Sequence, residues 1–400
     1  MTDSKKTDTQ SPGNNGLSRR ELLTRTAGAA ALASAPVTAL AESAVMPTRR
    51  LGKTNKQIPV LLFGGGVTLD RNFDPKLAAA VKLGVTYFDT ADCYNGDQSE
   101  VAVGNYIKKA DNRDAVWITS KSDKWDPAGF EATVRQSLER LQVKTIDMYY
   151  LHKLNDADVF TPELKATVEK LKAEGAFQHF GFSCHNDNVP ELLHKAAETP
   201  WVESVMFRYN FRKYGDAELN AAMDAAHAAD VGLIAMKTQG SEASFKEAVT
   251  AWEQTGKWTK HQAVIKAVLG DKRITAAVSH MKNLTMLTEN AAAAADRSEL
   301  GMLDRQELHR YAELTRPYAC DGCEHICNAA VDAPVRIGHT LRALMYHESY
   351  GEPEKARSVF AQLPAEARQL DGVDFAPAAE ACPHGVDVPA LMERAKSVLV

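Results

Sequence analysis

A regular alternation of short β-rich runs and amphipathic helical segments over residues 46–296 most constrains what this chain can fold into. Within the helical segments the apolar side chains recur on one stripe, as Phe130, Val134 and Leu141 do. The expected strands are 58–64, 87–91, 116–120, 146–151, 179–183, 204–209, 232–236 and 274–279. The expected helices are 74–83, 99–109, 127–142, 162–174, 188–198, 216–229, 258–269 and 284–295.

Eight strands that each feed a helix predict an α/β fold, a (β/α)8 or TIM barrel. A doubly wound open sheet is the alternative, but its G-x-G-x-x-G turn is absent, and a run of three glycines beginning at Gly64 follows the first strand. A chain of 400 residues has room for one large domain and an appendage. We therefore expect a leader over 1–45, the barrel over 46–310 and a small helical domain over 311–400.

Charge and hydropathy exclude two classes of protein. The net charge of −5 argues against a nucleic-acid binder that relies on a basic face. No run of 18 or more apolar residues occurs, so the sequence predicts no membrane span. We expect a small molecule as the ligand, and neither nucleic acid nor a stable place in the bilayer.

The first 45 residues have the order of features that an export signal has. Arg19 and Arg20 precede an Ala-rich apolar run from Ala27 to Ala41, which ends in small residues. The paired arginines resemble those of a twin-arginine signal, although Leu22 stands where that motif more often has Phe. We expect cleavage after Ala41, the twin-arginine export machinery as a partner and a periplasmic location. A disordered leader on a cytoplasmic protein is the alternative.

Four chemically complementary side chains fall at the ends of three consecutive expected strands. They are Asp89, Tyr94, Lys121 and His152, and in a barrel the carboxyl ends of the strands form the catalytic face. A phenol with a pKa of about 10 is a poor acid, but a nearby ammonium lowers that pKa and a carboxylate holds the ammonium in place. A neutral imidazole donates a hydrogen bond to a carbonyl. The set suits protonation of a carbonyl oxygen while hydride reaches the carbon.

These residues lie in motifs that resemble the aldo-keto reductase family. The motifs are the run from Gly84 to Tyr94, Lys121 after Ile-Thr-Ser, and His152 after Met-Tyr-Tyr-Leu, and the match continues across 48–296. The resemblance implies a carbonyl/alcohol oxidoreductase with NADP or NAD as cofactor and a small carbonyl or alcohol as substrate. It also implies Tyr94 as the general acid, Lys121 and Asp89 as the residues that tune it, and His152 as the residue that positions the carbonyl.

The same resemblance implies a set of cofactor-binding positions. Ser183 would lie by the nicotinamide amide, segment 237–241 by the pyrophosphate, and Lys282 by the adenosine 2′-phosphate. Glu289 and Asn290 would lie near the adenine. The full set is Gly64, Ser183, Lys237, Gly240, Ser241, Lys282, Glu289 and Asn290.

The sequence departs from the family at the cofactor. Met206 stands where a Gln is common, and Cys184 where an Asn is frequent. At the expected 2′-phosphate position only Lys282 and His280 remain as cations, and Met286 stands where an Arg is common. Since phosphate recognition favours the Arg fork, the sequence leaves NADP, NAD or neither as the preferred nucleotide.

Four cysteines follow in the tail. Cys320, Cys323 and Cys327 form C-x2-C-x3-C, and Cys382 comes later before a proline. The spacing resembles the ligand set of a ferredoxin-type [4Fe-4S] cluster, and some aldo-keto reductases carry a C-terminal iron–sulfur module. A zinc site with four cysteine ligands and two disulfides are the alternatives.

The remaining two cysteines and the tail histidines have plainer interpretations. Cys93 and Cys184 are expected to pack as small apolar side chains. His325 and His384 are expected beside the cysteine site or at the surface, not as ligands.

Two functions follow from these patterns. The first is a nicotinamide-dependent carbonyl/alcohol oxidoreductase with an accessory cluster. The second is an exported electron-transfer or binding protein on a reductase-like barrel with little or no nicotinamide chemistry. Because hydride transfer moves two electrons and an iron–sulfur cluster moves one, we expect the cluster to be structural or to serve a redox partner protein. The identity of the substrate does not follow from the sequence.

Overall fold

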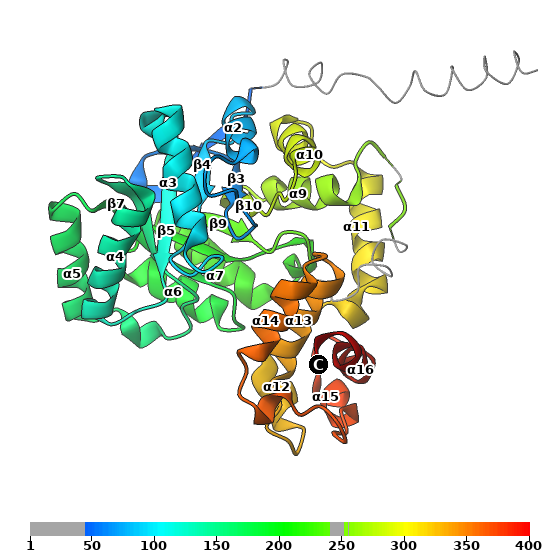
Figure 1. The fold of residues 1–400 in the computed structure, drawn as a ribbon. Coiled ribbons are helices and arrows are strands. Elements are labelled where there is room, and N and C mark those ends of the chain that lie inside the picture. The colour runs from blue at the N-terminus through cyan, green and yellow to red at the C-terminus, as the bar shows by residue number, and fades with distance from the viewer. Residues whose placement is uncertain (1–44, 241–251, 255) are drawn as a thin grey trace, which may run out of the picture. The chain divides into compact units, whose positions relative to one another are not determined.

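Eight parallel strands close into a barrel in the computed structural model, which describes residues 45–240, 252–254 and 256–400 (Figure 1). Their order around the barrel is the chain order, with the last strand beside the first. The strands are β3 (Leu61–Gly64), β4 (Tyr87–Asp89), β5 (Trp117–Ser122), β6 (Ile146–Leu151), β7 (Phe177–Cys184), β8 (Ser204–Arg208), β9 (Gly232–Met236) and β10 (Ile274–Ser279). The closed barrel confirms the predicted fold class. The expected export signal, its cleavage point and Ser241 lie outside the described residues.

The first expected strand, 58–64, is two strands and not one. β2 (Gln57–Pro59) pairs antiparallel with β1 (Thr48–Arg50), and only β3 belongs to the barrel. The chain changes partners at Val60, whose N–H donates to the carbonyl of Pro47 at 3.0 Å. Because Pro59 has no N–H to give to a ladder, it is suited to the end of an edge strand.

Eight helices follow the strands in the order predicted. They are α2 (Pro75–Lys82), α3 (Gln98–Ala110), α4 (Pro127–Leu141), α5 (Pro162–Ala173), α6 (Val189–Glu198), α7 (Ala217–Ala228), α9 (Lys260–Gly270) and α10 (Leu284–Ala295). Local sequence fixes where several of them begin. Asp74, Asp126 and Thr161 each accept a hydrogen bond from a first-turn N–H and each precede a proline at the first helical position.

Alternating strand residues build an apolar layer on each side of the barrel wall. Leu62, Tyr87 and Met148 belong to the cluster that fills the interior, whereas Phe63 and Phe88 pack outside it with the helices. This is the period of two that a strand imposes on its side chains. Because the interior is filled, functional groups emerge at the carboxyl ends of the strands.

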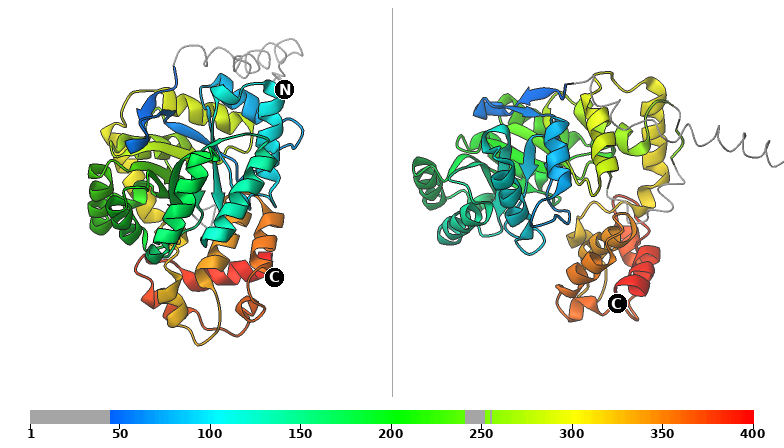
Figure 2. Two further views of the ribbon diagram at one scale, coloured as in Figure 1. Left: turned by 90° about the vertical axis from the view of Figure 1, so that its left-hand side faces the viewer. Right: turned by 45° about the horizontal axis from the view of Figure 1, so that its top comes forward.

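The C-terminal region has an apolar core of its own, which includes Ile337, Leu344, Phe360 and Met392. Its helices are α12 (Glu324–Ala329), α13 (Ile337–Glu348), α14 (Pro353–Ala361), α15 (Ala376–Ala381) and α16 (Val388–Leu399). They gather into one group, orange to red in Figure 2. The preceding helix, α11 (Met302–Leu314), spans the predicted 310/311 boundary. Within the described residues, no helix combines the length and apolar character of a transmembrane segment.

Candidate active site

The structure brings the four predicted catalytic side chains together at the open end of the barrel. Asp89 ends β4, Lys121 lies in β5, His152 follows β6, and Tyr94 is in the loop after β4. The Lys121 Nζ lies 2.6 Å from Asp89 Oδ1, and both side chains are almost fully buried. Lys121 also donates to Tyr94 Oη at 3.5 Å and to the carbonyl of Thr90 at 2.6 Å. The rings of Tyr94 and His152 meet edge to face, with centroids 5.5 Å apart.

Burial governs the protonation of this group. It raises the pKa of the Tyr94 phenol well above its ordinary value, and the Asp89 carboxylate raises it further. The prediction that Lys121 lowers the pKa of the Tyr94 phenol is therefore wrong. The Lys121 ammonium lies closer to Asp89 than to Tyr94, so its charge is largely compensated there. Burial also raises the pKa of Asp89, against the pull of Lys121. The Tyr94 phenol is therefore protonated at neutral pH.

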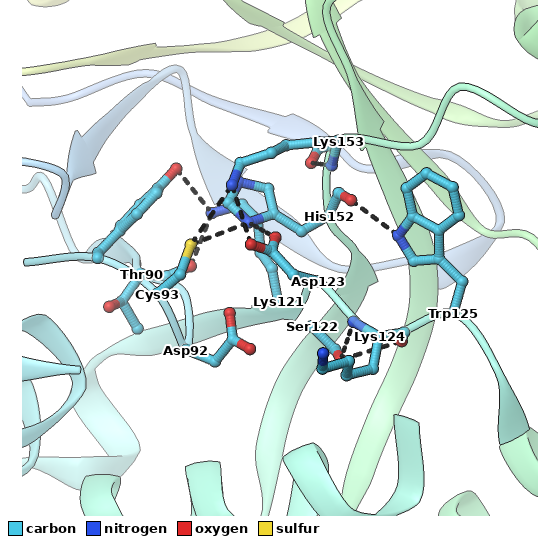
Figure 3. A network of polar contacts seen from close by, with 12 residues as sticks. Thr90, Asp92, Cys93, Lys121, Ser122, Asp123, Lys124, Trp125, His152 and Lys153 are labelled. Carbon is cyan, nitrogen blue, oxygen red and sulfur yellow. Dashed lines mark hydrogen bonds and ion pairs between the residues drawn. The ribbon is translucent and has the colours of Figure 1, made fainter. Parts of the chain in front are cut away.

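His152 has a carboxylate partner that the sequence analysis missed. Its Nδ1 lies 2.7 Å from Asp123 Oδ1, and Trp125 Nε1 donates to its backbone carbonyl at 2.9 Å (Figure 3). Burial lowers the pKa of His152 to about 4, against the effect of Asp123, so the ring is neutral at neutral pH, as predicted. Although burial opposes it, the hydrogen bond from His152 holds the pKa of Asp123 below its usual range. The sequence signal for Asp123 was its position directly after β5, two residues beyond Lys121.

The Asp123 contact also sets the tautomer of the imidazole. A ring nitrogen that faces a carboxylate at hydrogen-bond distance carries the proton, so Nδ1–H of His152 donates to Asp123. In the neutral ring Nε2 then carries a lone pair. It accepts a hydrogen bond from an alcohol, but it does not donate one to a carbonyl. The predicted hydrogen bond from this ring to a carbonyl therefore requires the proton to move from Nδ1 to Nε2.

The two barrel cysteines differ in their environments. Cys184, at the end of β7, is fully buried, which confirms its expected packing role. Cys93 is exposed, so the same expectation is wrong there. Its Sγ lies 3.5 Å from His152 Nδ1 and 3.8 Å from Lys153 Nζ (Figure 3). The physical reason is its position in the loop after β4, where its side chain lines a cavity at the barrel mouth.

A cavity of about 800 Å³ lies at this end of the barrel, within the range of roughly 300–1,000 Å³ typical of small-molecule sites. Its wall includes Tyr94 and His152 from the strand-end loops. It also includes Arg342, Tyr346 and Lys355 from α13 and α14. The C-terminal region thus supplies part of the wall around the candidate catalytic group, which the sequence did not indicate.

The predicted cofactor positions divide into two groups. Lys237, Lys282, Glu289 and Asn290 line the cavity. Gly64, Ser183 and Gly240 are buried but are not part of its wall. The Ser183 hydroxyl accepts from the Lys153 N–H at 3.2 Å, and a Cβ at Gly64 would meet the His280 ring at 2.5 Å. Ser183 and Gly64 therefore lie next to two residues of the cavity wall, Lys153 and His280, and not in the wall itself.

Lys282, the expected 2′-phosphate cation, already has a carboxylate partner. Its Nζ lies 3.3 Å from Glu352 Oε1 and 5.1 Å from the centroid of the Tyr350 ring. Lys237 and Arg342 differ from it, since neither has an ion-pair partner among the described residues. Burial lowers the pKa of Lys237, and neighbouring Arg342 contributes to the lowering. Uncompensated positive charge in the cavity therefore lies at Lys237 and Arg342, away from Lys282.

The four tail cysteines lie close enough to influence one another's charge. Burial, together with the charges of Cys320, Cys323 and Cys382, raises the pKa of Cys327 to about 12. All four are free thiols, so the disulfide alternative is not realised in this structure. Arg208, at the end of β8, donates to the carbonyl of Cys320 at 2.7 Å. Cys320 also lines the cavity that Tyr94 lines.

The distances between the tail thiols can be compared with those between the ligands of a single zinc ion. Ligand atoms on one zinc ion, at bonds of about 2.3 Å, lie at most about 4.6 Å apart. Among the described residues, one group of three or more potential ligands has all its atoms within 4.8 Å of one another, and the tail cysteines are not in it. No three of the tail thiols therefore all lie within that distance of one another in this structure.

Comparison with known proteins agrees with this geometry. The family model described as "Aldo/keto reductase family" matches residues 65–300. L-galactose dehydrogenase of Arabidopsis thaliana is 23% identical over 311 residues, 67% of this chain and 94% of the relative. The uncharacterised oxidoreductase YqkF of Bacillus subtilis is 32% identical over 145 residues, 34% of this chain and 46% of the relative.

Solved structures share the fold. An aldo-keto reductase from Klebsiella pneumoniae in complex with NADPH has a TM-score of 0.54 and 22% identity, and the match covers 68% of this chain and 95% of that one. The holo form of an aldo-keto reductase from Bacillus halodurans has a TM-score of 0.56 and 20% identity, over 66% and 96%. Since the family model covers more than half of the sequence, the chain belongs to the aldo/keto reductase family.

Proposed function

We propose that the protein is a nicotinamide-dependent oxidoreductase that interconverts a small carbonyl compound and its alcohol, with Tyr94 as general acid. The observation that carries the proposal is the contact of Lys121 Nζ with both Asp89 Oδ1 and Tyr94 Oη at the wall of one cavity. NADPH is named in the Klebsiella pneumoniae structure, and a sugar dehydrogenase is among the relatives. Both support the same reaction class.

The residues have separable roles in this reaction. A nicotinamide bound in the cavity would supply or accept the hydride. The Tyr94 hydroxyl donates its proton to the substrate oxygen as negative charge develops there. The Lys121 ammonium, held by Asp89, stabilises the phenolate that remains. His152 lies edge to face with Tyr94, and its Nε2 lone pair suits a hydrogen bond from the alcohol.

The cavity fits a nucleotide with phosphates. Lys237 and Arg342 face it without ion-pair partners in the described part of the chain, and burying unpaired cations is costly unless a ligand neutralises them. We place the cofactor phosphates at these two residues. Arg342 of the C-terminal region would then supply the positive charge that is missing at Met286.

Arg342→Gln tests this placement. Loss of a charged hydrogen bond to a phosphate costs about 1.5–3 kcal/mol, so we expect the Kd for NADPH to rise by at least about tenfold. Fluorescence titration of the anaerobically purified protein measures it. The matched control is Arg357→Gln, also in the C-terminal region but exposed and outside the cavity wall. Equal affinity of the two variants would contradict the placement.

The same titration of the unaltered protein with NADPH and NADH tests the function itself. Saturable binding of either nucleotide is the expected result. The second candidate function, an electron-transfer or binding protein, is favoured by the Lys282–Glu352 ion pair, which neutralises an expected phosphate cation. Binding of neither nucleotide would support that second candidate and contradict the first.

We propose that Cys320, Cys323, Cys327 and Cys382 hold a [4Fe-4S] cluster, with a zinc ion as the alternative. Their C-x2-C-x3-C and Cys-Pro spacing in the sequence and the influence of their charges on one another support the cluster. The thiolates would be the ligands, and the cluster would supply one-electron transfer or structural cross-linking. We expect about four irons and four acid-labile sulfides per chain, whereas one zinc per chain would favour the alternative.

We also propose export by the twin-arginine route, on the basis of Arg19, Arg20 and the apolar run to Ala41. A copy tagged at its C-terminus is expected in the periplasmic fraction, shortened by the signal. Conversion of both arginines to lysine should leave it full-length in the cytoplasm. A full-length cytoplasmic product from the unaltered gene would refute export.

A further inference from the structure

Four side chains at the rim of the barrel form a second set of potential metal ligands, separate from the tail cysteines. Asp92 and Cys93 follow β4, Asp123 follows β5 and His152 follows β6 (Figure 3). One atom from each, a carboxylate oxygen, a thiol sulfur or a ring nitrogen, lies within 4.8 Å of all the others. We propose that these four residues bind one divalent cation of the zinc class.

The donor types match that class of cation. Nitrogen from His, sulfur from Cys and oxygen from Asp are the ligands that zinc takes, usually four in a tetrahedron. With bonds of about 2.0–2.3 Å, tetrahedral ligand atoms lie roughly 3.3–3.8 Å apart. His152 Nδ1 already lies 3.5 Å from Cys93 Sγ and 2.7 Å from Asp123 Oδ1. The set therefore needs changes of about an ångström, which loop side chains accommodate.

An unsatisfied atom supports the site independently. Asp92 Oδ1 is buried and has no hydrogen-bond partner among the residues that the structure describes. Backbone N–H groups of Cys93 and Asp123 and the Lys153 ammonium offset only part of the cost of burying this carboxylate. A cation bound between Asp92 and the other three side chains would satisfy it.

A positive charge already occupies this region. The Lys153 ammonium lies 2.9 Å from Asp123 Oδ2 and 3.8 Å from Cys93 Sγ. The Lys153 side chain is 46% exposed, so it can turn to solvent when a cation enters. Lys153 therefore competes with the metal, and its removal should strengthen metal binding.

Metal binding would alter the ring that faces the substrate. Without the ion, Asp123 holds the proton on Nδ1 of His152. A metal on Nδ1 takes that position, so the neutral ring carries its proton on Nε2. If the proposed reductase function holds, the ring then donates a hydrogen bond to a carbonyl, which the metal-free tautomer cannot do. This consequence rests on the proposed function, but the metal site does not.

Titration with Co2+ tests the site, since cobalt replaces zinc and a cobalt–thiolate bond absorbs light. The anaerobically purified protein is compared with Cys93→Ser and with Asp92→Asn. We expect the unaltered protein to bind one more ion than Cys93→Ser, with a thiolate-to-cobalt band that the variant lacks. Asp92→Asn should lower the affinity for this ion by at least about 100-fold. Loss of a residue that only contacts a ligand costs up to about 100-fold in metal affinity, and a direct ligand should cost no less. Whatever the tail cysteines bind is common to all three proteins.

Two further variants make the test specific. Cys184→Ala removes the other barrel cysteine, which is buried away from the set, and should keep the extra ion. Lys153→Gln should bind it more tightly than the unaltered protein. The proposal is overturned if Cys93→Ser binds Co2+ as the unaltered protein does, if no thiolate band forms, or if Lys153→Gln binds more weakly. A protein that binds the ion but no nicotinamide nucleotide would retain this site and refute the reductase.

Discussion

Replacement of Tyr94 by Phe is expected to lower kcat by about 100- to 10,000-fold, the range that general acid catalysis contributes. The variant keeps the ring that packs against His152 and under Lys121 and removes only the hydroxyl that Lys121 contacts. The cofactor Kd and the melting temperature should change little. The measurement is steady-state kinetics with the carbonyl compound that the unaltered protein reduces fastest in a panel of aldehydes and ketones.

The matched control for Tyr94 is Tyr106→Phe. The Tyr106 hydroxyl accepts a hydrogen bond from Asn112 at 3.1 Å in the outer part of the fold, away from the cavity wall. Its kcat should stay close to the unaltered value, because Tyr106 is buried in the core outside the barrel wall and its hydroxyl lies away from the catalytic group. An unchanged kcat in Tyr94→Phe would remove the general-acid assignment.

The second large effect is expected from Cys382→Ala, which should remove nearly all iron and acid-labile sulfide from the protein. Cys382 lies between α15 and α16, and Cys327 lies in α12. A cluster held by both ties these helices together. Because metal binding contributes directly to the stability of a small domain, the C-terminal helices should also melt at a lower temperature than the barrel.

His384→Gln serves as the control for Cys382. His384 follows two residues later, and its Nε2 lies 3.4 Å from Asp321 Oδ2. It should retain the full iron content. Anaerobic iron and sulfide assays and the loss of visible absorbance on dithionite addition measure both variants. Full iron in Cys382→Ala would exclude that residue as a ligand, and one zinc per chain in the unaltered protein would replace the cluster by a zinc site.

The barrel and its four central residues were accessible from the sequence because their signals are local. Each strand end follows a short apolar run, and parallel strands bring all such ends to one edge. That is why Asp89, Lys121 and His152, from three consecutive strands, could be expected at one site. The division of 58–64 into two strands was harder to foresee, since a proline inside a short apolar run is consistent with either an edge or an end.

Electrostatics at the site needed coordinates. The pKa of Tyr94 depends on its burial and on its distance from the Asp89 carboxylate, and neither can be read from the sequence. Likewise, the partner of His152 Nδ1 sets its tautomer, and Asp123 could be recognised as that partner only once the β5 and β6 loops were seen side by side. The exposure of Cys93 follows from the same loop geometry.

The sequence by itself determined the barrel, the Asp89–Tyr94–Lys121–His152 group and the spacing of the tail cysteines, because periodicity and motif spacing are properties of neighbouring residues. The tertiary structure alone decided what surrounds that group. Arg342 from α13 lines the cavity, and Glu352 pairs with Lys282 from 70 positions away in the chain. Helical periodicity says which face of α13 is apolar, but it does not say what its polar side chains meet, since that depends on how separate elements pack.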